Sequence, residues 1–371
     1  MRSILCRAAR RGAAGAALAI LAACQSLQPA PPPLPAGTAG VGASGTVALP
    51  PPPEISPPGP VGAAPPPVAP ADSRPPAAPG APAPPGETAP PVPSPAPPPP
   101  PRPIHIALAL GGGGTRGFAH VGVIKALEAR GIEPDIVVGT SVGSFVAALY
   151  AAGYAGADLQ KVAMQFEESS ITDWSLPSRG LFKGLGLQDF VNRKVDQRPI
   201  EKLPRKLAIV ATELDTGDMV VFERGNVGMA VRASSSVPGV FQPVSIGGHE
   251  FVDGGLVSPV PVRVARRLGA DVVIAVDISK RPADQSTTGA FDILLQTFAI
   301  MGQVIARSEL QSADIVLRPA LGVAGSTDFS ARETAIREGE QAVAAQAGAI
   351  AAAVARARQN VAEIGTSAPA H

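Results

Sequence analysis

Two stretches decide the fold of this 371-residue chain: residues 104–117, IHIALALGGGGTRG, and residues 135–143, DIVVGTSVG. Each stretch starts as an apolar run of the length of a β-strand and ends in glycines, which mark a turn. Apolar residues at helical spacing follow each stretch, over 118–127 and over 145–152. The order strand, helix, strand, helix predicts an α/β domain with a parallel sheet and right-handed crossovers.

Further apolar runs extend this pattern toward the end of the chain. More strands are expected at 207–212, 220–223, 250–252, 272–276 and 315–317, and more helices at 158–168, 188–195, 261–268, 291–310 and 333–358. We expect the folded domain to occupy residues 104–360, followed by a frayed tail at 361–371. A domain of this size suits a single α/β unit.

The segment before the domain has a different composition. Between Pro29 and Pro103 lie 32 of the 43 prolines. Proline fixes φ and removes a backbone donor, so residues 24–103 are expected to form a disordered, extended tether. The charges of the whole chain, 31 basic against 30 acidic, argue against nucleic acid as a partner.

The N-terminus has the pattern of an export signal. A basic start is followed by a short apolar run at 13–22, which is too short to span a bilayer. The run ends in LAAC at 21–24, which resembles the lipobox of bacterial lipoproteins. That resemblance implies a signal peptide at 1–23 and a lipid on Cys24. Gln25 after the cysteine implies a location on the periplasmic side of the outer membrane.

The only other cysteine, Cys6, lies inside this signal. The domain therefore has no thiol for a disulfide, a zinc–thiolate site or a cysteine nucleophile.

Residues 139–143 form a G-x-S-x-G motif between a predicted strand and a predicted helix. Glycines on either side of Ser141 remove side-chain clashes in a sharp turn and leave the hydroxyl exposed at the edge of the sheet. Ser141 alone would fit the N-cap of the helix equally well. The strand–turn–helix context favours a nucleophile.

The glycines at 111–114, followed by Gly117, form a loop in which backbone N–H groups can converge on an anion. A nucleotide P-loop is excluded because it needs a Gly-Lys-Ser/Thr sequence. A dinucleotide site needs an acidic residue at the end of the second strand, whereas Asp135 stands at its start. An oxyanion hole fits best, since both glycine turns follow neighbouring parallel strands.

Asp253, in the sequence Asp253-Gly254-Gly255, is the best candidate for the base that would activate Ser141. None of the four histidines, His105, His120, His249 and His371, stands in a convincing triad position. Apolar neighbours of Asp253 would bury the carboxylate and raise its proton affinity. We therefore favour a Ser–Asp dyad.

Three motifs in this order, GGGTRG at 112–117, GTSVG at 139–143 and DGG at 253–255, resemble the blocks of the patatin-like phospholipase family. Residues 233–241, ASSSVPGVF, resemble a further block of that family, and the resemblance covers about 104–277. It implies a three-layer α/β/α fold that hydrolyses acyl esters of lipids, such as phospholipids, without a metal or other cofactor.

The same resemblance implies roles for single residues. Ser141 would be the nucleophile, Asp253 the base, and the N–H groups of Gly112, Gly113 and Gly114 the oxyanion hole. Arg116 would be structural or would contact an anionic group of the substrate. The other motif residues would support the site: Gly117, Gly139, Gly143, Gly254 and Gly255.

Two other functions stay open: a lipid-binding envelope module without turnover, and an esterase or thioesterase acting on soluble acyl groups. A basic segment at 179–206 is either a solvated face or a lip that docks on anionic membrane.

Overall fold

A computed structural model describes residues 102–167, 173, 179–280, 287–322 and 331–367. The chain divides into two units, residues 1–89 and 90–371, and every described residue belongs to the second. The expected signal peptide and Cys24 lie outside the described residues, as does the expected tether up to residue 101.

The described part of the chain contains an eight-stranded sheet with strand order β10-β9-β1-β2-β4-β8-β7, and β5 also pairs with β4. Strands β10, β9, β1, β2 and β4 run parallel, whereas β5 and β8 are antiparallel to β4 and β7 is antiparallel to β8. The strands are β1 (Ile106–Leu110), β2 (Ile136–Thr140), β4 (Lys206–Glu213), β5 (Met219–Phe222), β7 (Val244–Ile246), β8 (His249–Asp253), β9 (Val272–Val276) and β10 (Ile315–Leu317).

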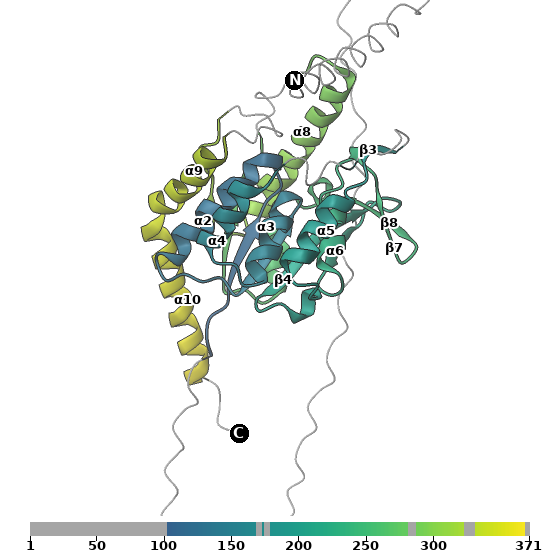
Figure 1. The fold of residues 1–371 in the computed structure, drawn as a ribbon. Coiled ribbons are helices and arrows are strands. Elements are labelled where there is room, and N and C mark those ends of the chain that lie inside the picture. Colours follow the sequence, from purple (N-terminus) through teal and green to yellow (C-terminus); the bar gives the residue numbers. More distant parts are fainter. Residues whose placement is uncertain (1–101, 168–172, 174–178, 281–286, 323–330, 368–371) are drawn as a thin grey trace, which may run out of the picture. The chain divides into compact units, whose positions relative to one another are not determined.

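Helices cover both faces of this sheet (Figure 1). They are α2 (Phe118–Glu128), α3 (Val142–Ala151), α4 (Gly156–Gln165), α5 (Leu185–Lys194), α6 (Val227–Ser234), α7 (Val262–Arg267), α8 (Ala290–Leu310), α9 (Arg332–Ala345) and α10 (Ala347–Ser367), with short 3-10 turns η2 (Gly114–Gly117), η4 (Ile200–Lys202) and η5 (Gly254–Leu256).

Successive side chains of a strand point to opposite faces of the sheet, so the sheet has one hydrophobic core on each face. Leu108 and Leu110 of β1 join the core that includes α2, α3, α9 and α10. Ala107 and Ala109 face the opposite side, where α7 and α8 pack. Because strands buried on both faces belong inside three-layer folds, this arrangement confirms the predicted α/β/α class with a mainly parallel sheet.

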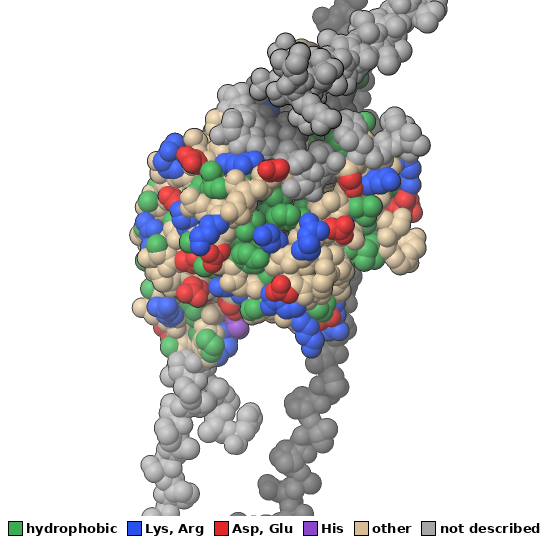
Figure 2. All heavy atoms as spheres, in the orientation of Figure 1, with side chains coloured by type: hydrophobic (Ala, Val, Ile, Leu, Met, Phe, Trp, Pro, Cys, Tyr) green, Lys and Arg blue, Asp and Glu red, His purple; other side chains and the backbone are tan. Residues whose placement is uncertain are grey.

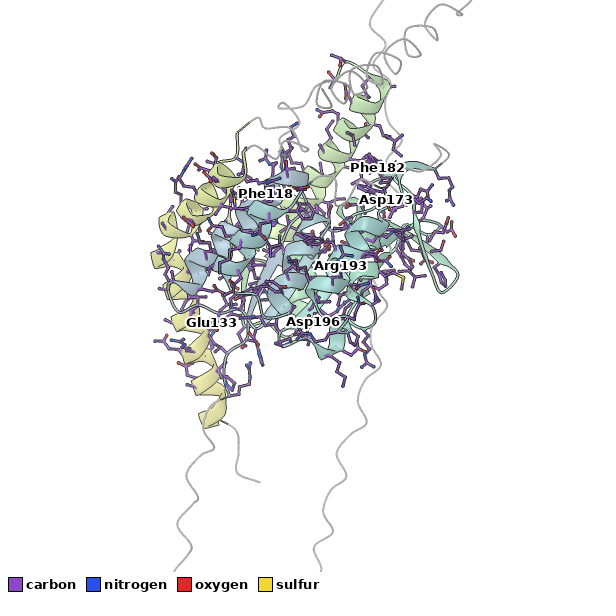
Figure 3. All side chains as sticks on the ribbon, in the orientation of Figure 1. Phe118, Glu133, Asp173, Phe182, Arg193 and Asp196 are labelled. Carbon is purple, nitrogen blue, oxygen red and sulfur yellow. The ribbon has the colours of Figure 1, made fainter. Side chains whose placement is uncertain are left out.

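A smaller sheet pairs β3 (Gly180–Phe182) in parallel with β6 (Gly239–Phe241). The ring of Phe182, labelled in Figure 3, lies 5.7 Å from the ring of Phe241. Asp173, also labelled there, accepts a hydrogen bond from the N–H of Gly184 at the start of α5. These contacts fix the chain on either side of β3.

Most predicted elements occur within a few residues of their expected positions, and β9 and β10 have the predicted bounds. The helix predicted at 333–358 is in fact two helices, which meet at Gln346, and α10 continues to Ser367, past the expected end of the domain at residue 360. The elements α6, β3, β6 and β7 were not predicted. Among the described helices, none combines the length and apolarity needed to cross a membrane.

Candidate active site

Strand β4 brings Ser141 and Asp253 together. Residues 209–210 of β4 pair with β2 on one edge and with β5 on the other edge. Residues 211–212 pair with β5 on that second edge, so their other partner, β8, lies on the first. Strands β2 and β8 therefore share one edge of β4 and approach each other end to end. Their last residues, Thr140 and Asp253, pair with consecutive residues of β4.

The backbone at Ser141 adopts φ 54° and ψ −129°, a left-handed region that a residue with a side chain rarely adopts. Its N–H donates to Ser234 Oγ at 2.8 Å. Ser141 stands at the N-cap position of α3, yet its side chain makes no capping hydrogen bond. The hydroxyl is therefore not used as a cap, which removes that alternative.

The glycines beside Ser141 allow α3 to approach the sheet closely. A Cβ at Gly139 would lie 2.5 Å from the carbonyl oxygen of Gly143. A Cβ at Gly143 would lie 2.1 Å from the carbonyl oxygen of Leu110. Any side chain at either position would push α3 away from the carboxyl ends of β1 and β2.

The glycine loop lies directly against Ser141, since a Cβ at Gly112 would be 3.2 Å from Ser141 Cβ. The N–H of Gly112 donates to the carbonyl oxygen of Pro259 at 3.0 Å. Contrary to the sequence prediction, Gly112 therefore offers no free donor, and its role is to permit this close approach.

Three backbone N–H groups in the glycine loop and at the start of α3 have no acceptor among the described residues. Within the part of the chain that the structure describes, those of Gly113, Gly114 and Val142 donate to no acceptor. Val142 follows Ser141 at the start of α3, where helix N–H groups are unsatisfied. Val142 was not among the predicted site residues, although the G-x-S-x-G motif places it directly after Ser141.

Asp253 is buried, with 7% of its surface exposed, and burial raises its pKa to about 6. Interactions with the Ser141 hydroxyl and with the N–H of Gly255 oppose this rise. The Gly255 N–H donates to Asp253 Oδ1 at 2.7 Å. Asp253 Oδ2 is buried without a hydrogen-bond partner among the described residues, so the contact with Ser141 is looser than a full hydrogen bond. Such contacts often tighten when substrate binds.

The histidines of the described residues bind elsewhere. His120 Nε2 donates to the carbonyl oxygen of Gly111 at 2.8 Å, and burial lowers the pKa of His120 to about 4, which keeps the ring neutral. His105 pairs with Asp135 at the amino end of β1, and His249 pairs with Glu213. His371 lies outside the described residues.

Arg116 and Gly117 have structural contacts. Arg116 is buried, and its Nε donates to the carbonyl oxygen of Ile278 at 2.9 Å. A Cβ at Gly117 would lie 2.3 Å from Val142 Cγ2, and one at Gly254 would lie 2.2 Å from the carbonyl oxygen of Val210. These contacts join the glycine loop to the segment after β9 and hold η5 against β4.

Ser234 and Ser236 link the two halves of the site. Ser234 is fully buried and holds the N–H of Ser141, while the carbonyl oxygen of Ser236 accepts the N–H of Asp253 at 3.0 Å. Both serines belong to the segment 233–241 that resembles a family block, which was the only sequence signal for them.

A buried carboxylate is linked to the end of β2 by hydrogen bonds. Glu309 of α8 accepts the Ser258 hydroxyl at 2.6 Å, and the carbonyl oxygen of Ser258 accepts the Thr140 hydroxyl at 2.8 Å. Burial raises the pKa of Glu309, and its hydrogen bonds to Ser258 and Val260 oppose the rise. Glu309 belongs to no motif, so it could not be predicted as a site residue.

Comparison with known proteins identifies the domain that carries this site. Residues 108–266 match the family model described as patatin-like phospholipase. Patatin-like phospholipase domain-containing protein 6 of Mus musculus is 36% identical over 188 residues, 48% of this chain and 14% of that protein. An uncharacterized NTE family protein of Mycobacterium tuberculosis is 38% identical over 171 residues, 46% of this chain and 48% of that protein. The chain thus spans less than half of either relative.

Two solved structures are also similar. VipD from Legionella pneumophila aligns over 65% of this chain and 66% of its own, with a TM-score of 0.41 and 15% identity. The type III effector protein ExoU aligns over 68% of this chain and 54% of its own, with a TM-score of 0.38 and 16% identity. The family model and the curated relatives together show that residues 108–266 of this chain are similar to patatin-like phospholipase domains.

Proposed function

We propose that this chain hydrolyses acyl esters of lipids with Ser141 as the nucleophile and Asp253 as the base. The observation that carries the proposal is the meeting of β2 and β8 on one edge of β4, which brings a hydroxyl and a buried carboxylate together. The match of residues 108–266 to the patatin-like phospholipase family model supports the same chemistry.

The first half of the reaction forms an acyl-enzyme. Ionised Asp253 accepts the proton of the Ser141 hydroxyl as the oxygen attacks the ester carbonyl carbon. The resulting oxyanion binds the free N–H groups of Gly113, Gly114 and Val142. Collapse of this intermediate breaks the ester bond, and the alcohol leaves with the proton that Asp253 had taken.

The second half releases the acid. A water molecule attacks the acyl carbon while Asp253 takes one of its protons. A second oxyanion forms, binds the same N–H groups and collapses. The bond to Ser141 Oγ breaks, the serine regains a proton from Asp253, and the free fatty acid leaves.

The elevated pKa of Asp253 suits this role. A carboxylate of ordinary pKa is a weak base at neutral pH, whereas one whose pKa is about 6 is still ionised there and binds a proton more strongly. Burial therefore gives Asp253 the higher proton affinity that a histidine has when it acts as the base of a Ser–His–Asp triad.

We further propose that a lipid on Cys24 anchors the protein on the periplasmic side of the bacterial outer membrane, within reach of its lipid substrates. The sequence LAAC at 21–24 and the proline-rich segment that follows support this location.

Site-directed variants test the catalytic proposal. Against a panel of phospholipids and lysophospholipids in mixed micelles, Ser141→Ala and Asp253→Asn should each lose activity by about a thousandfold or more. Ser235→Ala is the control, because the Ser235 hydroxyl is buried without a hydrogen-bond partner in the described residues. Full activity of the Ser141→Ala protein would refute the proposal.

A fluorophosphonate probe and a soluble ester separate the two alternatives. Labelling of Ser141 without turnover of any ester would favour a lipid-binding module. Hydrolysis of a monomeric short-chain ester or thioester, with none of micellar lipid, would favour a soluble acyl substrate.

A further inference from the structure

Helix α8 is much longer than the sheet on which it packs. It returns the chain from the end of β9 to the start of β10, and Ile315 of β10 lies beside Ile274 of β9. Its 21 residues span ~31 Å, whereas the five-residue strands of the sheet span ~17 Å. The N-terminal half of α8 therefore extends past the carboxyl edge of the sheet (Figure 1).

This extension exposes an apolar stripe. Ile293, Ile300 and Val304 recur at helical spacing on one face and are 54%, 48% and 63% exposed. Leu294 and Met301 border them and are 40% and 48% exposed. Among the α8 residues whose side chains the structure describes, the buried ones lie in the last turns, at Ala306, Glu309 and Leu310. We call the five exposed residues the α8 stripe.

The α8 stripe carries no charge of its own. Residues 293–306 contain no Asp, Glu, Lys or Arg. A soluble domain rarely exposes several large apolar residues side by side unless something binds there.

The C-terminal half of α8 contacts residues next to the candidate site. Glu309 holds Ser258, and a Cβ at Gly302 would lie 3.9 Å from the carbonyl oxygen of Gly255. Gly255 in turn donates to Asp253. The α8 stripe thus begins beside the Asp253 segment and runs outward from the edge of the sheet where Ser141 lies.

We propose that the α8 stripe docks on a lipid surface and enters its apolar layer, so that Ser141 faces the membrane. This inference rests on the proposed function, because a lipid acyl hydrolase must reach esters at such a surface. In this proposal α8 lies in the plane of the interface, with the α8 stripe against the apolar layer. Without basic residues on the stripe, binding depends on apolar contact and is insensitive to salt.

The basic segment at 179–206 fits this role less well. Arg179 forms a two-pronged ion pair with Glu250, and Arg205 and Lys206 donate to backbone carbonyl oxygens of Tyr150 and Leu268. These basic groups contact separate elements of the protein rather than forming one free face.

Vesicle flotation tests the proposal with the full chain carrying Cys24→Ser and Ser141→Ala, which removes the expected lipid and turnover. We expect this protein to bind neutral phosphatidylcholine vesicles equally at low and high salt. The triple variant Ile293→Gln, Leu294→Gln, Ile300→Gln keeps helix propensity and should bind about tenfold more weakly or worse. The control is Leu214→Gln with Met219→Gln, since both side chains are 40% exposed elsewhere.

Unchanged vesicle binding by the triple variant would overturn the proposal, as would equal loss in the control. A dimer in sedimentation that the triple variant abolishes, without any effect on vesicles, would identify the α8 stripe as a contact between copies and also overturn it. With Ser141 restored, the triple variant should hydrolyse a soluble short-chain ester normally and vesicle phospholipid poorly. If no ester is hydrolysed, the proposed function fails, while flotation still decides the role of α8.

Discussion

At the scale of the residue, burial changes the acid–base behaviour of Asp253. Its carboxylate lies in the core at the end of β8, and the loss of water raises its pKa to about 6. The proposed reaction needs the ionised form. We therefore expect kcat/KM to fall as the pH drops through about 6 and to level off above it. A pH–rate profile on a soluble ester checks this, and an acid limb near pH 4 would contradict it.

Ser234 is the residue that holds the strained backbone of Ser141. Ser234→Ala leaves the part-buried N–H of Ser141 without its acceptor, which costs about 1–3 kcal/mol. We expect kcat to drop about tenfold or more with little change in KM, and slower labelling of Ser141 by a fluorophosphonate. Ser235→Ala, one residue away, should behave as the unmodified protein. Equal kinetics for both variants would assign Ser234 to packing alone.

The motifs predicted Ser141 and Asp253 because each motif lies within a few consecutive residues. Glycines that permit a tight turn flank Ser141, and two further glycines follow the Asp253 carboxylate. The supporting contacts could not be predicted in this way. Glu309 reaches the site through Ser258, 51 residues earlier in the chain, and Gly112 loses its N–H to Pro259. These hydrogen bonds join residues that only the folded chain brings together, and they follow no regular spacing in the sequence.

At the scale of the element, α2 and α9 pack at glycines. A Cβ at Gly122 would lie 1.8 Å from the carbonyl oxygen of Ile336, and one at Gly339 would lie 2.1 Å from that of Ala119. Gly122→Ala should therefore lower the free energy of unfolding by about 1–3 kcal/mol. Denaturant melts measure this, with Gly348→Ala on α10 as the control.

Nothing lies within 4 Å of a Cβ at Gly348, so this substitution should be neutral or stabilise α10 by up to about 1 kcal/mol. Equal destabilisation by both variants would show that helix contact is not the cause.

Strands and helices with strong periodicity were predicted well, as β9 and α8 show. The break between α9 and α10 at Gln346 was not, because alanine-rich sequence favours helix on both sides of it. Strands β6 and β7 are three residues long, too short for alternation to be evident. The position of β8 on the edge of β4 that β2 also uses depends on register, which a single sequence does not reveal.

At the scale of the whole molecule, basic and acidic residues are nearly equal in number. On the face shown in Figure 2, acidic and basic side chains are interspersed, in keeping with 31 basic and 30 acidic residues in the chain. Attachment to a membrane would then depend on Cys24 and on the α8 stripe, and not on a field of one sign.

The contribution of Cys24 can be separated from that of α8 in cells. We expect Cys24→Ser to move the protein from the outer-membrane fraction to the soluble periplasmic fraction, because a single apolar helix face gives weaker retention than acyl chains. Fractionation with detection of the protein measures this, and Cys6→Ser is the control within the expected signal. Outer-membrane retention of the Cys24→Ser protein would contradict the lipobox interpretation.

The backbone at Ser141 has a consequence for the history and the engineering of this chain. At φ 54° and ψ −129° the backbone strain of serine is about 1–3 kcal/mol higher than that of glycine. A library sorted for heat resistance alone would drift toward glycine at this position and discard the hydroxyl. If Ser141 is the nucleophile that we propose, glycine variants would survive heating better and would have lost ester hydrolysis.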